Sequence, residues 1–122
     1  GLTYDVVHAR VKKMIQNKVI ENFLTIIDFE KCGFLYYSVL LKFADDKFEN
    51  FLLFNSQLKL DPLVIRRFAC VGEFSFMFEI VDNNYISIND KLNKIRSQFH
   101  DMIRYSQIVP IQDHHFYRAK LE

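Results

Sequence analysis

The first twenty residues carry a local excess of basic side chains, which could contact phosphates. Arg10, Lys12, Lys13 and Lys18 stand here against the single acidic residue Asp5. The segment therefore has a formal charge of +3 in a chain of net charge +1, and the remaining residues sum to −2. Lysine and arginine bind nucleic-acid phosphates, but a basic helix face taken by itself is more often only solvated surface. Any nucleic-acid binding must be local to this end of the chain.

The rest of the sequence shows no catalytic pattern. The glycines are Gly1, Gly33 and Gly72, so there is no phosphate-cradling glycine loop, and there is no nucleophile elbow or metalloprotease pair. His114 and His115 are neighbours, and on a strand such neighbours point to opposite faces and cannot chelate together. We expect no enzyme activity, no metal and no cofactor.

Two cysteines, Cys32 and Cys70, are 38 positions apart and match neither a zinc ribbon nor a disulfide framework. Unpaired cysteines are typical of a reducing, cytoplasmic setting. A chain of 122 residues makes about one domain, and it contains neither an apolar run of about 18 residues nor a secretory leader. We therefore expect a soluble cytoplasmic protein that does not enter membranes.

Hydrophobic periodicity predicts the elements that position these residues. Thr3 is a suitable amino-terminal cap for a helix that ends between Gln16 and Lys18. Residues 22–29 alternate as a strand. The buried stripe expected of the helix consists of Val7, Val11, Met14 and Ile15.

Residues 34–43 are apolar on nearly both sides, which is typical of a central strand. A helix is predicted over 45–59. Leu53 and Phe54 lie off its stripe and indicate a second contact surface. The stripe consists of Phe48, Phe51, Leu52 and Leu58.

Two more strands are predicted over 63–71 and 74–81, joined by a tight hairpin at Gly72-Glu73 where Gly72 takes a positive φ. The second strand alternates strictly, so its aromatic residues share one face. The residues of that face are Phe74, Phe76, Phe78 and Ile80.

The last predicted helix begins at a capping box of Ser87 and Asp90 and runs to about Ile103. Residues 106–119 return as an extended segment, with Pro110 at an edge or bulge. The resulting α+β order is the ferredoxin-like βαββαβ arrangement, with two helices on one face of an antiparallel sheet. The other sheet face is also apolar, and we expect a second copy of the chain to cover it.

Five short motifs occur in a set order along the chain. Three lie early: Lys18-Val19-Ile20, Asp28-Phe29-Glu30-Lys31 and Gly33. Two lie downstream: Pro62-Leu63-Val64 and Val71-Gly72-Glu73-Phe74. Their order and spacing resemble those of the Lrp/AsnC transcriptional regulators of bacteria and archaea. In that family they stand at "GVI", "D-P-E-K", a glycine, "P-x-V" and a glycine hairpin, and the resemblance covers essentially the whole chain.

The resemblance implies three parts. Residues 1–20 are the carboxyl-terminal part of a helix-turn-helix DNA-binding domain, 21–30 a linking strand, and 31–122 the effector-binding (RAM) and oligomerisation domain. It implies a regulator that binds double-stranded DNA, forms homodimers and larger rings, and responds to a small-molecule effector. Since a helix-turn-helix needs a preceding helix, we expect further residues upstream and poor DNA binding by this chain alone.

The resemblance also implies which side chains contact DNA. Lys12 and Lys13 would meet phosphates. Arg10 is either a further contact or a structural bracket beside the apolar stripe. Contacts to bases or sugars are implied for Thr3, Tyr4 and His8.

The effector contact is expected at the hairpin, where Val71, Gly72 and Glu73 expose backbone amides and carbonyls to a small polar ligand. Ser75 completes this group. The family commonly has an aspartate at that position, and a serine hydroxyl is a weaker partner for an ammonium group. The effector is therefore amino-acid-like or of another class. Lys18 likewise replaces a glycine of the family.

Two other functions fit the same elements. One is a stand-alone ligand-binding or assembly domain without DNA binding, and two more helices encoded upstream would argue against it. The other is a sirohaem decarboxylase, whose fold is similar. Those enzymes resemble one another in strand motifs with histidine and tryptophan, whereas this chain has no tryptophan.

Overall fold

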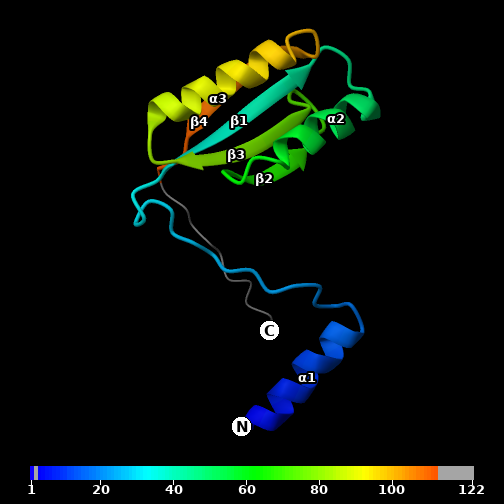
Figure 1. The fold of residues 1–122 in the computed structure, drawn as a ribbon. Coiled ribbons are helices and arrows are strands. Elements are labelled where there is room, and N and C mark those ends of the chain that lie inside the picture. The colour runs from blue at the N-terminus through cyan, green and yellow to red at the C-terminus, as the bar shows by residue number, and fades with distance from the viewer. Residues whose placement is uncertain (2, 113–122) are drawn as a thin grey trace.

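The computed structural model describes residue 1 and residues 3–112, and Figure 1 shows its helices and strands. No helix in the described part of the chain is long and apolar enough to cross a membrane. The elements in chain order are α1 (Tyr4–Gln16), β1 (Leu35–Phe43), α2 (Phe48–Leu58), β2 (Val64–Ala69), β3 (Phe76–Asp82), α3 (Tyr85–Gln98) and β4 (Ile103–Pro110).

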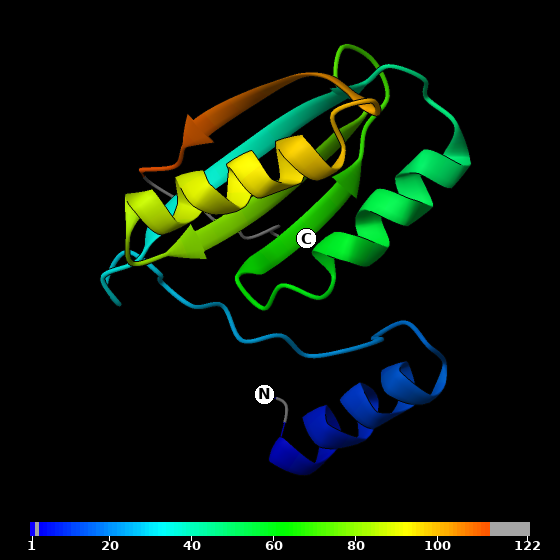
Figure 2. The same ribbon diagram turned by 45° about the horizontal axis from the view of Figure 1, so that its top comes forward.

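The four strands form one antiparallel sheet in the order β2-β3-β1-β4. Val39 of β1 stands opposite Phe78 of β3 on one side and Ile108 of β4 on the other, so β1 is an interior strand as predicted. Helices α2 and α3 both cover one face of the sheet (Figures 1 and 2). The ferredoxin-like prediction is confirmed.

Phe54 is the centre of the core, and the prediction that it lies off the buried stripe of α2 was wrong. Its ring centroid is 5.0 Å from those of both Phe76 and Phe99, and the side chain is fully buried. The buried row of α2 contains Phe54 and Leu58, whereas Phe48 is exposed. Rows of a helix that are one residue apart differ by only 100°, and both rows here are apolar, so periodicity could not choose between them.

Both core helices begin at other residues than predicted. α2 begins at Phe48, and Asp46, which was predicted to lie in the helix, precedes it and accepts hydrogen bonds from Lys42 and Ser75. α3 is capped by Asn84, whose side chain accepts from the Ile86 N–H at 2.8 Å. The capping box at Ser87 was therefore wrong, because its hydroxyl donates to Asp82 at 2.6 Å.

The last helix and the last strand are both shorter than the sequence predicted. α3 ends at Gln98 and β4 begins at Ile103, where a continuous helix was predicted. β4 ends at Pro110 on an edge of the sheet, in agreement with the prediction for that proline. The rest of the predicted segment, including His114 and His115, lies outside the described residues.

The turn between β2 and β3 spans residues 70–75 and is wider than the predicted two-residue hairpin. The N–H of Cys70 donates to the Ser75 carbonyl at 3.0 Å and closes the turn. Gly72 has a φ of +125°, which confirms the expected positive φ at that residue.

The predicted linking strand is absent from the described chain, since residues 20–28 have no strand partner. Figure 1 shows this segment between α1 and the sheet, drawn without a strand arrow. A strand needs a neighbour for its backbone hydrogen bonds, and none of the described residues pairs with this segment. Four large apolar side chains are consequently exposed: Phe23, Leu24, Ile26 and Ile27.

The stripe of α1 is likewise not buried, contrary to prediction. No residue of this helix is buried, and Val7, Met14 and Ile15 are each between 37% and 45% exposed. The spacing is that of an amphipathic helix, but no described element packs against it.

Candidate functional site

α1 has well-formed ends. At its start, the Thr3 hydroxyl accepts from the Val6 N–H at 3.4 Å, as expected of an amino-terminal cap. At its end, the Lys18 N–H donates to the Ile15 carbonyl and the Val19 N–H to the Met14 carbonyl, at 3.1 and 2.9 Å. These two bonds form a Schellman motif that satisfies the last carbonyls of the helix.

Lys18 occupies the left-handed position of this motif, with a φ of +56°. An L side chain at such a φ costs about 1–2 kcal/mol, and glycine avoids most of that cost. The glycine that stands here in the Lrp/AsnC pattern would suit the backbone that Lys18 adopts.

Lys18→Gly should therefore stabilise the end of α1 by about 0.5–1 kcal/mol. We expect amide hydrogen exchange at Val19 to slow by about two- to five-fold. Lys13→Gly is the matched control, because glycine inside a helix costs about 1 kcal/mol and should speed exchange. Faster exchange in Lys18→Gly would contradict the strain at Lys18.

The structure brings three of the six predicted DNA-contacting side chains onto one side of α1. The rings of Tyr4 and His8 stack, with centroids 5.9 Å apart and planes 13° apart. Lys12 follows at the same four-residue spacing, so it continues this row. Arg10 and Lys13 project from other sides of the helix, since each residue turns the direction by 100°. All six predicted residues are exposed.

At the hairpin, Val71 and Gly72 form an exposed tip. The tip is held to β4 by Tyr105, whose hydroxyl donates to the Glu73 carbonyl at 3.2 Å. The Tyr105 ring also meets Phe74 edge-on at 5.8 Å. Tyr105 was missed from the sequence, since nothing local to residue 105 indicates that β4 passes the hairpin.

Ser75 is engaged in the fold and does not present a free hydroxyl. Its oxygen accepts from the Phe43 N–H at 3.1 Å, and its hydroxyl donates to the Asp46 carboxylate. The other oxygen of Asp46 accepts from the Lys42 ammonium at 2.6 Å. The exposed carboxylate beside the hairpin therefore belongs to Asp46, which the sequence predicted only as part of a helix start.

Lys42 lowers the pKa of the Asp46 carboxyl from its usual value, and the Ser75 hydroxyl lowers it further. Because the folded pKa lies below the unfolded one, the stability that these contacts add is present at neutral pH. It is lost as the pH falls through the folded pKa.

Ser75→Ala should raise the pKa of Asp46, so that this loss begins at a higher pH. Lys42→Met should raise the pKa further, because Lys42 is the larger cause. Carbon-13 NMR titration of the Asp46 carboxyl carbon measures both shifts. An Asp46 pKa that is the same in the wild type and in Ser75→Ala would remove the hydroxyl from this network.

A second polar network lies on the sheet face that carries no helix. The Tyr36 hydroxyl donates to the Glu79 carboxylate, and Arg66 donates to the Tyr36 oxygen at 2.6 Å and to Glu79. Burial, followed by the bond to Glu79, raises the pKa of Tyr36 to about 12. The phenol is thus protonated at neutral pH and serves as a structural donor. The three residues come from β1, β2 and β3, so only strand pairing brings them together.

Within the described residues, no three histidine, cysteine, aspartate or glutamate side chains lie close enough together to hold a metal ion. Cys32 is exposed and Cys70 is partly exposed, and both are free thiols.

Several solved structures that superpose on this chain are transcriptional regulators. A regulator from Neisseria meningitidis in complex with L-methionine superposes with a TM-score of 0.78 at 13% identity, over 99% of this chain and 78% of that chain. AsnC of E. coli superposes with a TM-score of 0.75 at 16% identity, over 98% and 79%. A feast or famine regulatory protein from M. tuberculosis, complexed with L-methionine, gives 0.73 at 19% identity, over 98% and 79%.

No protein-family model and no curated protein matches the sequence. The likeness to the solved structures extends over nearly the whole chain, so it includes α1 and the segment after it as well as the sheet. The structural neighbours of this chain are AsnC/Lrp-family regulators, and the chain has their fold.

Proposed function

We propose that this chain is part of a cytoplasmic DNA-binding transcriptional regulator of the Lrp/AsnC type, and that it is not an enzyme. In this proposal residues 1–20 end the DNA-binding domain, 21–30 link the domains, and 31–122 bind the effector and hold the assembly together. The main support is the superposition of nearly the whole chain, including α1, on such regulators. A superposition of the sheet domain alone would support only the assignment of residues 31–122.

α1 is the proposed DNA-contacting helix. Its row of Tyr4, His8 and Lys12 combines an aromatic pair with a cation along one exposed side. Such a row suits a helix that meets base edges near its start and phosphates further along. Arg10 lies on the other side of the apolar stripe from this row. This position favours a structural role for Arg10 and not a contact with DNA.

Lys12→Ala in the full-length regulator should weaken binding to a DNA duplex from its own promoter region. Loss of one phosphate contact should also reduce the slope of log affinity against log salt by about 0.9. Fluorescence anisotropy between about 50 and 200 mM salt measures both effects. Lys94→Ala, on α3, is the matched control, and an unchanged slope in Lys12→Ala would remove Lys12 from the interface.

A second copy of the chain is the proposed cover for the open sheet face. One row across this face is largely apolar. In it, Met77 of β3 lies between Phe68 of β2 and Leu40 of β1. Phe68 is 40% exposed in the single chain. A contact related by twofold symmetry would bury this row in both copies at once and give the unpaired segment 20–28 a partner.

The effector is proposed to bind at the hairpin tip, at a contact between such dimers. The backbone at Val71 and Gly72 is open to a ligand, and Asp46 places a half-exposed carboxylate behind Ser75. An ammonium group can pair with that carboxylate, so an amino-acid-like effector is compatible with the serine. L-Methionine, bound in two of the structural neighbours, is the first compound to test.

Effector control then follows from different affinities of the ligand for two assemblies. The native mass of the protein, measured with and without L-methionine, tests this step. A shift in the distribution of assemblies supports it, and an unchanged distribution together with no bound ligand contradicts it for this compound.

A further inference from the structure

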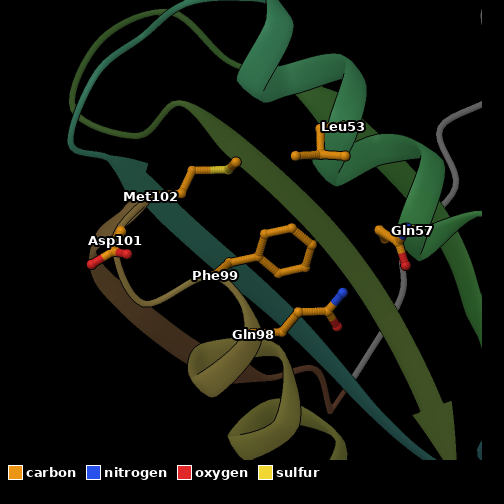
Figure 3. Close-up of a pocket in the computed structure, with 6 residues that line it drawn as sticks. All are labelled: Leu53, Gln57, Gln98, Phe99, Asp101 and Met102. Carbon is orange, nitrogen blue, oxygen red and sulfur yellow. The ribbon is translucent and has the colours of Figure 1, made fainter.

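A cavity of about 320 Å³ opens between α2 and the turn that connects α3 to β4, and its lining includes no residue of the hairpin or of α1. Figure 3 shows the Phe99 ring at its centre, with Asp101 on one side and Gln57 on the other. The remaining lining residues are Leu53, Gln98 and Met102.

The apolar part of the cavity has the packed ring of Phe99 at its base and the flexible side chains of Leu53 and Met102 at its walls. Phe99 is only 7% exposed, and its ring is held edge-on by Phe54 with centroids 5.0 Å apart and planes 75° apart. Met102 packs against the core cluster, and Leu53 is half exposed at the wall. A preformed aromatic base beside a flexible methionine suits a ring-sized apolar group.

The polar part of the cavity has one sign of charge. Asp101 is the only ionisable residue of the lining, so the formal charge of the lining is −1. Its carboxylate is 92% exposed, with the His100 imidazole at 3.0 Å as an ion-pair partner only when that imidazole is protonated. Within the described residues, no hydrogen bond engages the side-chain amide of Gln57 or Gln98. A cation at one end and an uncharged polar group at the other would match these groups.

We propose that this cavity binds small aromatic amines, with the ring over Phe99, the ammonium towards Asp101 and an uncharged polar substituent towards Gln57 and Gln98. The site shares no lining residue with the hairpin contact of the proposed function, so each can fail without the other. Affinity comes mainly from apolar burial in an open cavity, so the dissociation constant should be on the order of 1 mM.

Tyramine is the probe, because it carries a ring, an ammonium and a hydroxyl. Its anionic counterpart, 4-hydroxyphenylacetate, has the same ring and hydroxyl. Titration of the nitrogen-15-labelled chain followed by amide NMR shifts should place tyramine at residues 53, 57 and 98–102. Tyramine should bind about two- to five-fold tighter than the anion, which is the range that an exposed ion pair supplies.

Asp101→Asn should reduce this preference to about one-fold, while Asp90→Asn, exposed on α3 outside the cavity, should leave it unchanged. Both substitutions are at exposed positions, and the amide spectrum of each variant reports that it is folded. Shifts confined to residues 71–75, equal binding of the two probes, or no shifts at several millimolar tyramine would each overturn the proposal.

Discussion

Phe54→Ala is expected to lower the free energy of unfolding by about 3–5 kcal/mol, the range for removing a buried aromatic ring. The ring contacts Phe43, Phe76, Phe78 and Phe99, at centroid distances between 5.0 and 6.2 Å. These residues come from β1, β3 and the end of α3, so the cavity left by alanine would open where both helices meet the sheet. Urea denaturation followed by far-UV circular dichroism measures the change.

The neighbouring residue provides the control for Phe54. Leu53→Ala removes a half-exposed side chain from the same helix and should change the unfolding free energy by at most about 1 kcal/mol. If Phe54→Ala does not fold, Phe54→Leu keeps most of the apolar volume and should show an intermediate loss. Equal losses in Leu53→Ala and Phe54→Ala would contradict the burial of Phe54 at the centre of the core.

Phe68→Asp is expected to convert the assembly to monomers. An aromatic residue that is fully buried in an interface contributes about 2 kcal/mol or more, and a twofold contact contains it twice, so the dissociation constant should rise about a thousand-fold. Sedimentation at micromolar concentration should show the wild type at no less than twice the chain mass of 14.6 kDa and the variant at 14.6 kDa.

Ile86→Asp is the matched control for Phe68→Asp. Ile86 is 67% exposed in the first turn of α3, on the face of the sheet that the helices cover, and an acidic residue there favours the helix. It should leave the assembly unchanged. A wild type that sediments only at 14.6 kDa would end the proposal that a second copy covers the open sheet face.

Local patterns predicted much of the fold correctly. Thr3 caps α1, β1 is an interior strand, Gly72 has a positive φ and Pro110 lies at a sheet edge. Each of these properties depends on one residue or on a short alternating run, so it can be predicted from a single sequence. The ordering of the same runs also predicted the ferredoxin-like topology.

The candidate site was predicted less completely. The hairpin residues were correctly placed at one turn. The carboxylate beside them, however, belongs to Asp46, and the hydroxyl that donates to the Glu73 carbonyl belongs to Tyr105. Asp46 is 29 positions from Ser75, and Tyr105 is 32 positions from Glu73. No local pattern relates residues at such separations, because strand pairing and not sequence distance makes them neighbours.

The sequence by itself determined α1, the type and order of the elements of the sheet domain, and which residue types stand on α1 and at the hairpin, because backbone preference and apolar periodicity are local properties. Only the tertiary structure decided that Phe54 is the core residue of α2, that Asn84 caps α3, and that Ser75 is bound to Asp46. The first two outcomes are choices between chemically similar residues of one segment, and the third joins residues that are 29 positions apart. Packing and hydrogen bonding across the sheet decide these outcomes, since they depend on residues that are distant in the chain.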